Sequence, residues 1–183
     1  LLGIHNIRNS TAAIAVAFIV GISTSNIKKG LINFKGVQRR FNKIFSYNEI
    51  DFFDDYAHHP TEIESVLEGV KAVYSKHEKV CIFQPHRISR LKDLRKEFSY
   101  SFENADIVIL CPIYTAGEKM KLGFNYNDFA KEIIKNSKVK LFMVNNDIQL
   151  AKFVKKNMYG NKIVIGMGAG SISSWIKNLP NLI

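Results

Sequence analysis

Apolar residues beyond position 50 alternate between continuous runs and a helical spacing of three and four residues. The continuous runs predict strands at residues 50–54, 80–84, 107–112, 140–144 and 163–166. The helical spacing predicts helices at residues 60–75, 89–102, 126–135, 147–158 and 171–177. Strands that are apolar throughout are typical of a parallel sheet covered on both faces. The pattern therefore predicts a doubly wound α/β domain.

The first 36 residues have a different pattern. Residues 5–23 are rich in alanine and apolar nearly all round, which predicts a buried helix. A second, short helix is expected at residues 25–34, with Ser25 or Asn26 as its N-cap. We expect a domain boundary near Gly36.

Residues 37–54 are expected to open the α/β domain. Residues 37–41 predict the lead-in to a strand, and residues 43–47 and 50–54 predict a β-hairpin. Its turn, Asn48-Glu49, lacks the glycine usual in such turns. Because Leu1 already lies inside a structured pattern, we expect the sequence to be a piece of a longer chain.

Unusual polar residues come directly after the predicted strands and so fall on one edge of the sheet. They are Asp54, Asp55 and His58 after the first strand, His86, Arg87 and Arg90 after the second, and residues 114–118 and 168–171 after later ones. Open α/β sheets bind ligands at this carboxyl edge. The sequence therefore predicts a site there.

The chemistry of these side chains leaves two interpretations open for each. Asp55 could accept the hydroxyls of a ribose or cap the next turn. His58 could contact a phosphate or be a half-buried loop histidine. Arg39 and Arg40 could contact a ligand or be plain surface charge.

Arg87 and Arg90 flank Ser89, which is expected to be the N-cap of the next helix. Their guanidinium groups would suit a carboxylate or a phosphate. Solvated arginines near a helix start are an equally ordinary interpretation.

Composition excludes several classes of protein. The chain is 46% hydrophobic and 23% charged, which is typical of a globular protein. Its net charge of +10 comes from lysines spread along the sequence without a block, which favours a solvated surface over a nucleic-acid partner. The longest apolar run, residues 12–22, is too short to span a bilayer, so no membrane partner is expected. Cys81 and Cys111 lie in predicted strands, and we expect buried free thiols in a reducing compartment.

Two common nucleotide signatures are absent from the sequence. Residues 166–171 (Gly-Met-Gly-Ala-Gly-Ser) only superficially resemble a dinucleotide fingerprint, because the third glycine comes one residue early and the run lies after the last strand. A tight turn leading into a terminal helix is the better interpretation. No Gly-x-x-x-x-Gly-Lys-Ser/Thr phosphate loop occurs either. No cysteine or histidine spacing indicates a metal site.

Taken together, the motifs resemble the UDP-N-acetylmuramate–L-alanine ligase family, one of the ATP-dependent Mur ligases of peptidoglycan synthesis. The matching stretches are His5-Asn6 and Asn9, residues 36–41 (Gly-Val-Gln-Arg-Arg-Phe), 54–62 (Asp-Asp-Tyr-Ala-His-His-Pro-Thr-Glu), 83–87 (Phe-Gln-Pro-His-Arg), 116–118 (Ala-Gly-Glu) and 168–170 (Gly-Ala-Gly). They cover nearly the whole chain.

The resemblance implies a fold and a division into domains. Residues 1–36 would be the C-terminal helices of a central ATPase domain, and residues 37–183 a complete Rossmann-like C-terminal domain. The implied enzyme is cytoplasmic and uses ATP and Mg²⁺, bound mainly by the central domain, to join L-alanine to UDP-N-acetylmuramate through an acyl phosphate. The fragment would be inactive alone.

The resemblance also implies roles for individual residues. Asn6 and Asn9 would contact the adenine, and Asp55 the ribose. Arg40 and His58 would act at the phosphates and are the catalytic candidates. The candidates for orienting the carboxylate of the incoming alanine are His86, Arg87 and Arg90. Two alternatives remain: a murein-peptide recycling ligase, and a non-catalytic nucleotide-binding remnant.

Overall fold

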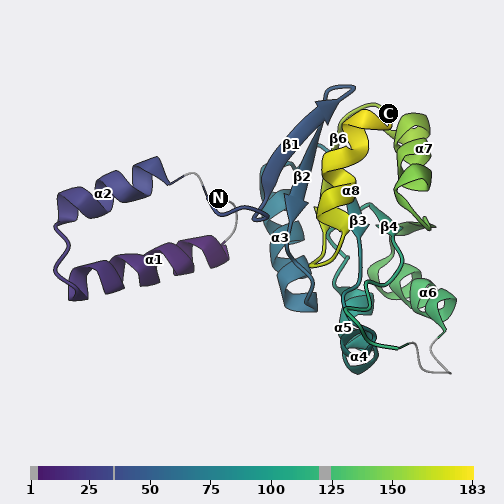
Figure 1. Ribbon diagram of the computed structural model, residues 1–183, viewed down its shortest axis with the longest axis horizontal. Helices are drawn as coiled ribbons and strands as arrows, with labels where there is room; N and C mark the ends of the chain where they lie inside the picture. The colour runs from purple at the N-terminus through teal and green to yellow at the C-terminus, as the bar shows by residue number, and fades with distance from the viewer. Residues whose placement is uncertain (1–3, 35, 120–124) are drawn as a thin grey trace.

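A six-stranded, mostly parallel sheet forms the centre of the computed structural model, which describes residues 4–34, 36–119 and 125–183 (Figure 1). The strands are β1 (Asn42–Tyr47), β2 (Ile50–Asp55), β3 (Glu78–Phe83), β4 (Ile107–Leu110), β5 (Lys140–Met143) and β6 (Lys162–Met167). Their order is β1-β2-β6-β3-β4-β5, and every neighbouring pair is parallel except the β1–β2 hairpin. The predicted α/β class and each predicted strand from β2 onward are confirmed.

The described residues also form eight helices and a terminal 3-10 turn. They are α1 (Ile4–Ile19), α2 (Thr24–Asn33), α3 (Pro60–Val73), α4 (Ile88–Asp93), α5 (Arg95–Tyr100), α6 (Tyr126–Ser137), α7 (Asp147–Asn157), α8 (Ile172–Asn178) and η1 (Leu179–Asn181). The single helix predicted at residues 89–102 is wrong. The chain kinks at Leu94, which ends α4 and precedes α5, and Leu91 of α4 and Phe98 of α5 both pack in the core.

The core has two layers, because successive strand residues point to opposite faces of the sheet. Cys81 and Phe83 of β3 pack beneath α3, α4, α5 and α6. Val80 and Ile82 pack beneath α7 and α8. Cys81 and Cys111 are buried free thiols, as predicted. Helices therefore cover both faces of the sheet.

The N-terminal helix pair extends to one side of the sheet (Figure 1). The prediction that α1 is buried is wrong, because Val16 is 59% exposed and Ile19 is 83% exposed. In the described residues α1 packs mainly against the short helix α2, which cannot cover it on all sides. The N-cap of α2 is Ser23, not Ser25 or Asn26. Its hydroxyl oxygen accepts from the backbone N–H of Asn26.

The predicted hairpin is confirmed, and its turn works without glycine. Asn48 and Glu49 both have positive φ angles, 48° and 64°, as the central residues of a type I′ turn do. Along the described residues, no helix combines the length and apolar character needed to cross a membrane.

Candidate active site

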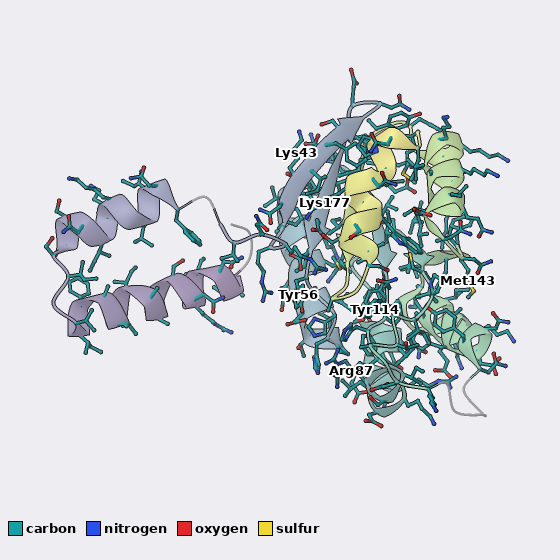
Figure 2. The ribbon with its side chains drawn as sticks, viewed as in Figure 1. Lys43, Tyr56, Arg87, Tyr114, Met143 and Lys177 are labelled. Carbon is teal, nitrogen blue, oxygen red and sulfur yellow. The ribbon has the colours of Figure 1, made fainter. Side chains whose placement is uncertain are left out.

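The carboxyl ends of four parallel strands meet in register. Asp55 of β2 pairs with Met167 of β6, which pairs with Phe83 of β3, which in turn pairs with Leu110 of β4. The loops that carry the predicted site residues therefore leave the sheet at one edge. Figure 2 shows Tyr56, Arg87 and Tyr114, from three of these loops, toward the same end of the domain.

A cavity of about 420 Å³ lies between the helix pair and the sheet domain; we call it the helix–sheet cavity. It brings together four of the predicted residues, Asn6 and Asn9 of α1 with Arg40 and Asp55. The other lining residues are mostly apolar: Ser10, Ala13, Gly30, Leu31, Phe34, Val37, Phe41 and Val66. Apolar walls with a few convergent polar groups are typical of small-molecule sites.

Asp55 is buried, and both of its carboxylate oxygens accept a backbone hydrogen bond. Oδ2 accepts from the N–H of Phe41, and Oδ1 from the N–H of Ala57, both at 2.8 Å. Asp55 therefore caps the turn that follows it, which is one of the two roles that its chemistry left open. Burial raises the pKa of Asp55, and these two backbone donors oppose that rise. Each oxygen keeps a second lone pair that can accept from a ligand.

Residues 38–41 form an irregular turn that leads directly into β1, so the predicted lead-in to a strand is confirmed, although it is not extended. Arg39 and Phe41 have left-handed φ angles of 58° and 52°, which interrupt an extended chain. Arg40 lies between them and lines the helix–sheet cavity. The two residues beside it are hydrogen-bonded to the end of β2 and the residue that follows it. The carbonyl of Arg39 accepts from the N–H of Tyr56, and the N–H of Phe41 donates to Asp55.

His58 sits in the turn between β2 and α3, held by a carboxylate. Its Nδ1 lies 2.9 Å from the carbonyl oxygen of Tyr56 and 3.3 Å from Glu62. Glu62 also accepts from the N–H groups of His58 and His59, as in a capping box at the start of α3. Although partial burial opposes it, these donors and the nearby His58 ring lower the pKa of Glu62.

His58, His86, Arg90 and Tyr114 form a second group, the histidine cluster. The rings of His58 and His86 have centres 5.8 Å apart, and the ring of Tyr114 stacks on His86 at 5.5 Å. A guanidinium nitrogen of Arg90 lies 3.3 Å from Nδ1 of His86. Because arginine can only donate, Nδ1 accepts and the neutral ring carries its proton on Nε2. Burial, Arg90, His58 and Arg87 lower the pKa of His86.

Arg87 is exposed at the start of α4, where it has a φ angle of 70°. Arg87 is the N-cap position, so the prediction that Ser89 caps this helix is wrong. Ser89 lies inside the helix, where its N–H and its hydroxyl both donate to the carboxylate of Glu118, at 2.9 and 2.7 Å. The carboxylate of Glu118, from another loop, thus accepts from a backbone N–H in the first turn of α4.

The glycine-rich turn after β6 leads into α8, as predicted. A Cβ on Gly168 would lie 2.7 Å from the carbonyl oxygen of Gln84, and one on Gly170 would lie 2.5 Å from Cγ of Tyr114. The side chain of Gln84 accepts from the N–H of Ile172 and donates to Ser171. The sequence did not predict that the side chains of Gln84 and Tyr114 would pack and hydrogen-bond the loops at this edge of the sheet together. Their position at the strand exits was the available signal.

The cavity fits a nucleoside with its phosphates better than it fits a bare metal. Its amides suit a base edge, its apolar walls suit a planar ring, and Arg40 suits a phosphate. Across residues 4–34, 36–119 and 125–183, no group of three or more His, Cys, Asp or Glu side chains is placed to hold a metal ion.

Comparison with known proteins assigns this arrangement to a family. Residues 39–170 match the family described as "Mur ligase, glutamate ligase domain". The chain belongs to this Mur ligase family. It is 72% identical over all 183 residues to the UDP-N-acetylmuramate–L-alanine ligase of Pelagibacter ubique, and it spans 39% of the length of that relative.

Two solved Mur ligase structures share the fold. UDP-N-acetylmuramate-alanine ligase from Thermotoga maritima superposes with a TM-score of 0.79 at 27% identity, over 99% of this chain and 38% of that one. A murein peptide ligase from Psychrobacter arcticus superposes with a TM-score of 0.74 at 23% identity, over 100% of this chain and 37% of that one. The predicted resemblance to this family is confirmed.

Proposed function

We propose that this chain forms the C-terminal part of an ATP-dependent ligase that joins L-alanine to UDP-N-acetylmuramate in peptidoglycan synthesis. The observation that carries the proposal is the helix–sheet cavity, which gathers Asn6, Asn9, Arg40 and Asp55 from segments far apart in the sequence. The 72% identity to a relative of that name supports this choice of substrates. The two buried free thiols agree with a reducing, cytoplasmic setting.

We further propose that residues 1–36 belong to the central ATPase domain and residues 37–183 to the C-terminal domain. No core residue of either layer precedes Phe41, so the described α/β part packs without the helix pair. The cavity at the junction is then an interdomain site. The remaining nucleotide and magnesium contacts come from the part of the relatives that this chain does not span.

ATP would supply the phosphoryl group that activates the muramyl carboxylate as an acyl phosphate. Asn6 and Asn9 offer amides to the edge of the adenine, and Asp55 offers its remaining lone pairs to ribose hydroxyls. Arg40 and His58 act at the phosphates, where charge stabilisation and positioning are the main protein contributions to phosphoryl transfer.

His86 and Arg90 of the histidine cluster, together with Arg87, suit the carboxylate of the incoming alanine. Arg87 is exposed at the site edge, and Arg90 lies beside a neutral His86 whose Nε2–H can donate. The guanidinium groups of Arg87 and Arg90 and the Nε2–H of His86 hold the carboxylate of alanine. The amine of the same alanine can then attack the activated carbonyl from a fixed direction.

A murein-peptide recycling ligase is the main alternative, because such a ligase shares the fold. A non-catalytic nucleotide-binding module is the other. A chimera distinguishes both alternatives from the proposal. In this ligase chimera, the present chain replaces the matching segment of the Pelagibacter ubique ligase and is joined to the upstream part of that enzyme. Phosphate release is then measured with ATP, UDP-N-acetylmuramate and either L-alanine or a murein tripeptide.

We expect this ligase chimera to release phosphate with L-alanine and not with the tripeptide. Release with the tripeptide alone would identify the recycling activity. Nucleotide binding without any release would identify the non-catalytic module. The 183-residue chain alone serves as the control and is expected to release no phosphate, whereas alanine-dependent release by it would contradict the interdomain site.

A further inference from the structure

Arg39 does not line the helix–sheet cavity, yet it is anchored from three directions beside it. One terminal guanidinium nitrogen donates to the carbonyl oxygen of Gly168 at 2.5 Å. The guanidinium carbon lies 4.5 Å from the ring centre of Tyr56, within cation–π range. Nε lies 3.9 Å from Oδ2 of Asp54. Arg39 therefore connects the end of β2 with the glycine-rich turn after β6.

Asp54 gives Arg39 its fixed counter-charge. This carboxylate is 1% exposed, and its Oδ2 accepts from the hydroxyl of Ser173 on α8 at 2.6 Å. A buried carboxylate with one hydroxyl donor needs a cation nearby, because an uncompensated buried charge is costly. Arg39, with its side chain 24% exposed, supplies that cation.

The backbone around Arg39 is strained and held from both sides. Arg39 and Phe41 have left-handed φ angles, which are uncommon for residues with large side chains. The carbonyl of Arg39 accepts from the N–H of Tyr56 at 2.8 Å, and the ring of Phe41 stacks on Phe53 at 4.2 Å. Strained residues persist where their surroundings over-determine them, and such places cluster at ligand sites.

We propose that Arg39 is the positioning residue of the nucleotide site: by holding the turn of residues 39–41 against the edge of the sheet, it directs Arg40 into the helix–sheet cavity. Arg40 is the residue between two fixed left-handed positions, so they set its direction. The inference rests on the proposed function for the identity of the ligand. It adds that nucleotide affinity depends on a side chain that does not touch the nucleotide.

The test compares variants of the ligase chimera by their dissociation constants for ATP and their KM values for ATP and L-alanine. Arg39→Ala is expected to weaken ATP binding at least tenfold and leave the KM for alanine within twofold. Arg39→Lys keeps the positive charge on a single donor nitrogen, and its dissociation constant for ATP is expected to fall between those of the wild type and Arg39→Ala. Arg40→Ala is the reference, and thermal melting reports folding.

Arg95→Ala is the matched control. It removes another arginine with a carboxylate partner, Glu132, which Arg95 binds through two nitrogens at 2.8 and 2.9 Å. Arg95 belongs to α5 and Glu132 to α6, and neither lines the helix–sheet cavity. This variant is expected to bind ATP as the wild type does, whatever its change in melting temperature.

The outcomes separate the inference from the function on which it rests. If Arg40→Ala weakens ATP binding and both Arg39 variants match wild type, the positioning role is wrong and the nucleotide site stands. If Arg40→Ala binds ATP normally, the nucleotide site itself is wrong. Equal losses toward ATP and alanine in Arg39→Ala would show a merely structural role. Should Arg39→Ala fail to fold, Arg39→Lys decides, with at least threefold weaker ATP binding required.

Discussion

Two successive acids at the end of β2, Asp54 and Asp55, are both buried and accept hydrogen bonds on opposite faces of the strand. Asp54 accepts from Ser173 on the side of α8, and Asp55 accepts from two backbone N–H groups on the side of α3. Alternation along a strand explains the division. Each acid thereby ties one neighbouring segment to the sheet, whereas Arg87 is exposed.

Arg87→Ala in the ligase chimera is expected to raise the KM for L-alanine by about tenfold to a hundredfold, the loss of one charge-assisted hydrogen-bonded contact. The KM for ATP should change by less than twofold, because Arg87 is absent from the helix–sheet cavity. Steady-state kinetics with each substrate varied in turn measure both. Equal changes for the two substrates would contradict the carboxylate role.

His86 should make the stability of the chain depend on pH. Its folded-state pKa lies below the ordinary value of 6.5, so the unfolded state binds more protons as pH falls through 6.5. Stability is then lost on going from about pH 7 to below 6. His86→Gln removes this titration, and its free energy of unfolding should vary less over that window. Urea unfolding at several pH values measures it, and parallel curves for the two proteins would refute the shift.

At the scale of elements, the sequence predicted the features that the apolar pattern sets and missed those that tertiary contacts set. The central strands were predictable because each has a continuous run of apolar residues, as in β4 with four buried residues. The kink at Leu94 was not, because apolar residues continue through it at helical spacing. By residue type alone Arg39 and Arg40 were equivalent, and the resemblance assigned a role only to Arg40. The contact of Arg39 with Gly168, 129 residues away, could not be predicted from the sequence.

The start of α3 provides a prediction at this scale. Glu62 accepts from the N–H groups of His58 and His59, so Glu62→Ala leaves two donors without their acceptor. We expect a loss of about 1 kcal/mol in the free energy of unfolding, typical of a lost helix cap. Glu64→Ala, an exposed acid in the same helix, is the control and should change stability by less than about 0.5 kcal/mol. Equal losses in a denaturant titration would contradict the capping role.

At the scale of the whole molecule, the two parts of the chain contribute differently to stability and to binding. The sheet domain contains both core layers, whereas the helix pair exposes large apolar side chains and supplies one wall of the cavity. The sequence located four of the five polar residues of that cavity by resemblance and did not single out Ser10. It could not show that Phe41 and Val66 complete the wall, since their role depends on how the segments pack.

A truncated chain of residues 37–183 tests this division. We expect it to melt cooperatively within a few degrees of the 183-residue chain, because none of the core residues in the described part of the chain is removed. It should bind ATP at least tenfold more weakly, since Asn6 and Asn9 are gone. Calorimetry of melting and of ATP binding gives both quantities. A truncated chain that does not melt cooperatively would contradict the proposed boundary near Gly36.

The aligned ends of β2, β6, β3 and β4 have a consequence for how this domain can change during evolution. Deleting or adding one residue inside β2 would turn every later side chain of that strand to the opposite face. Asp55 would then face α8 and Asp54 would face α3, so both acids would lose their donors at once. Loops at this edge can vary in length without moving these acids, whereas the number of residues in β2 is fixed by the hydrogen bonds of Asp54 and Asp55.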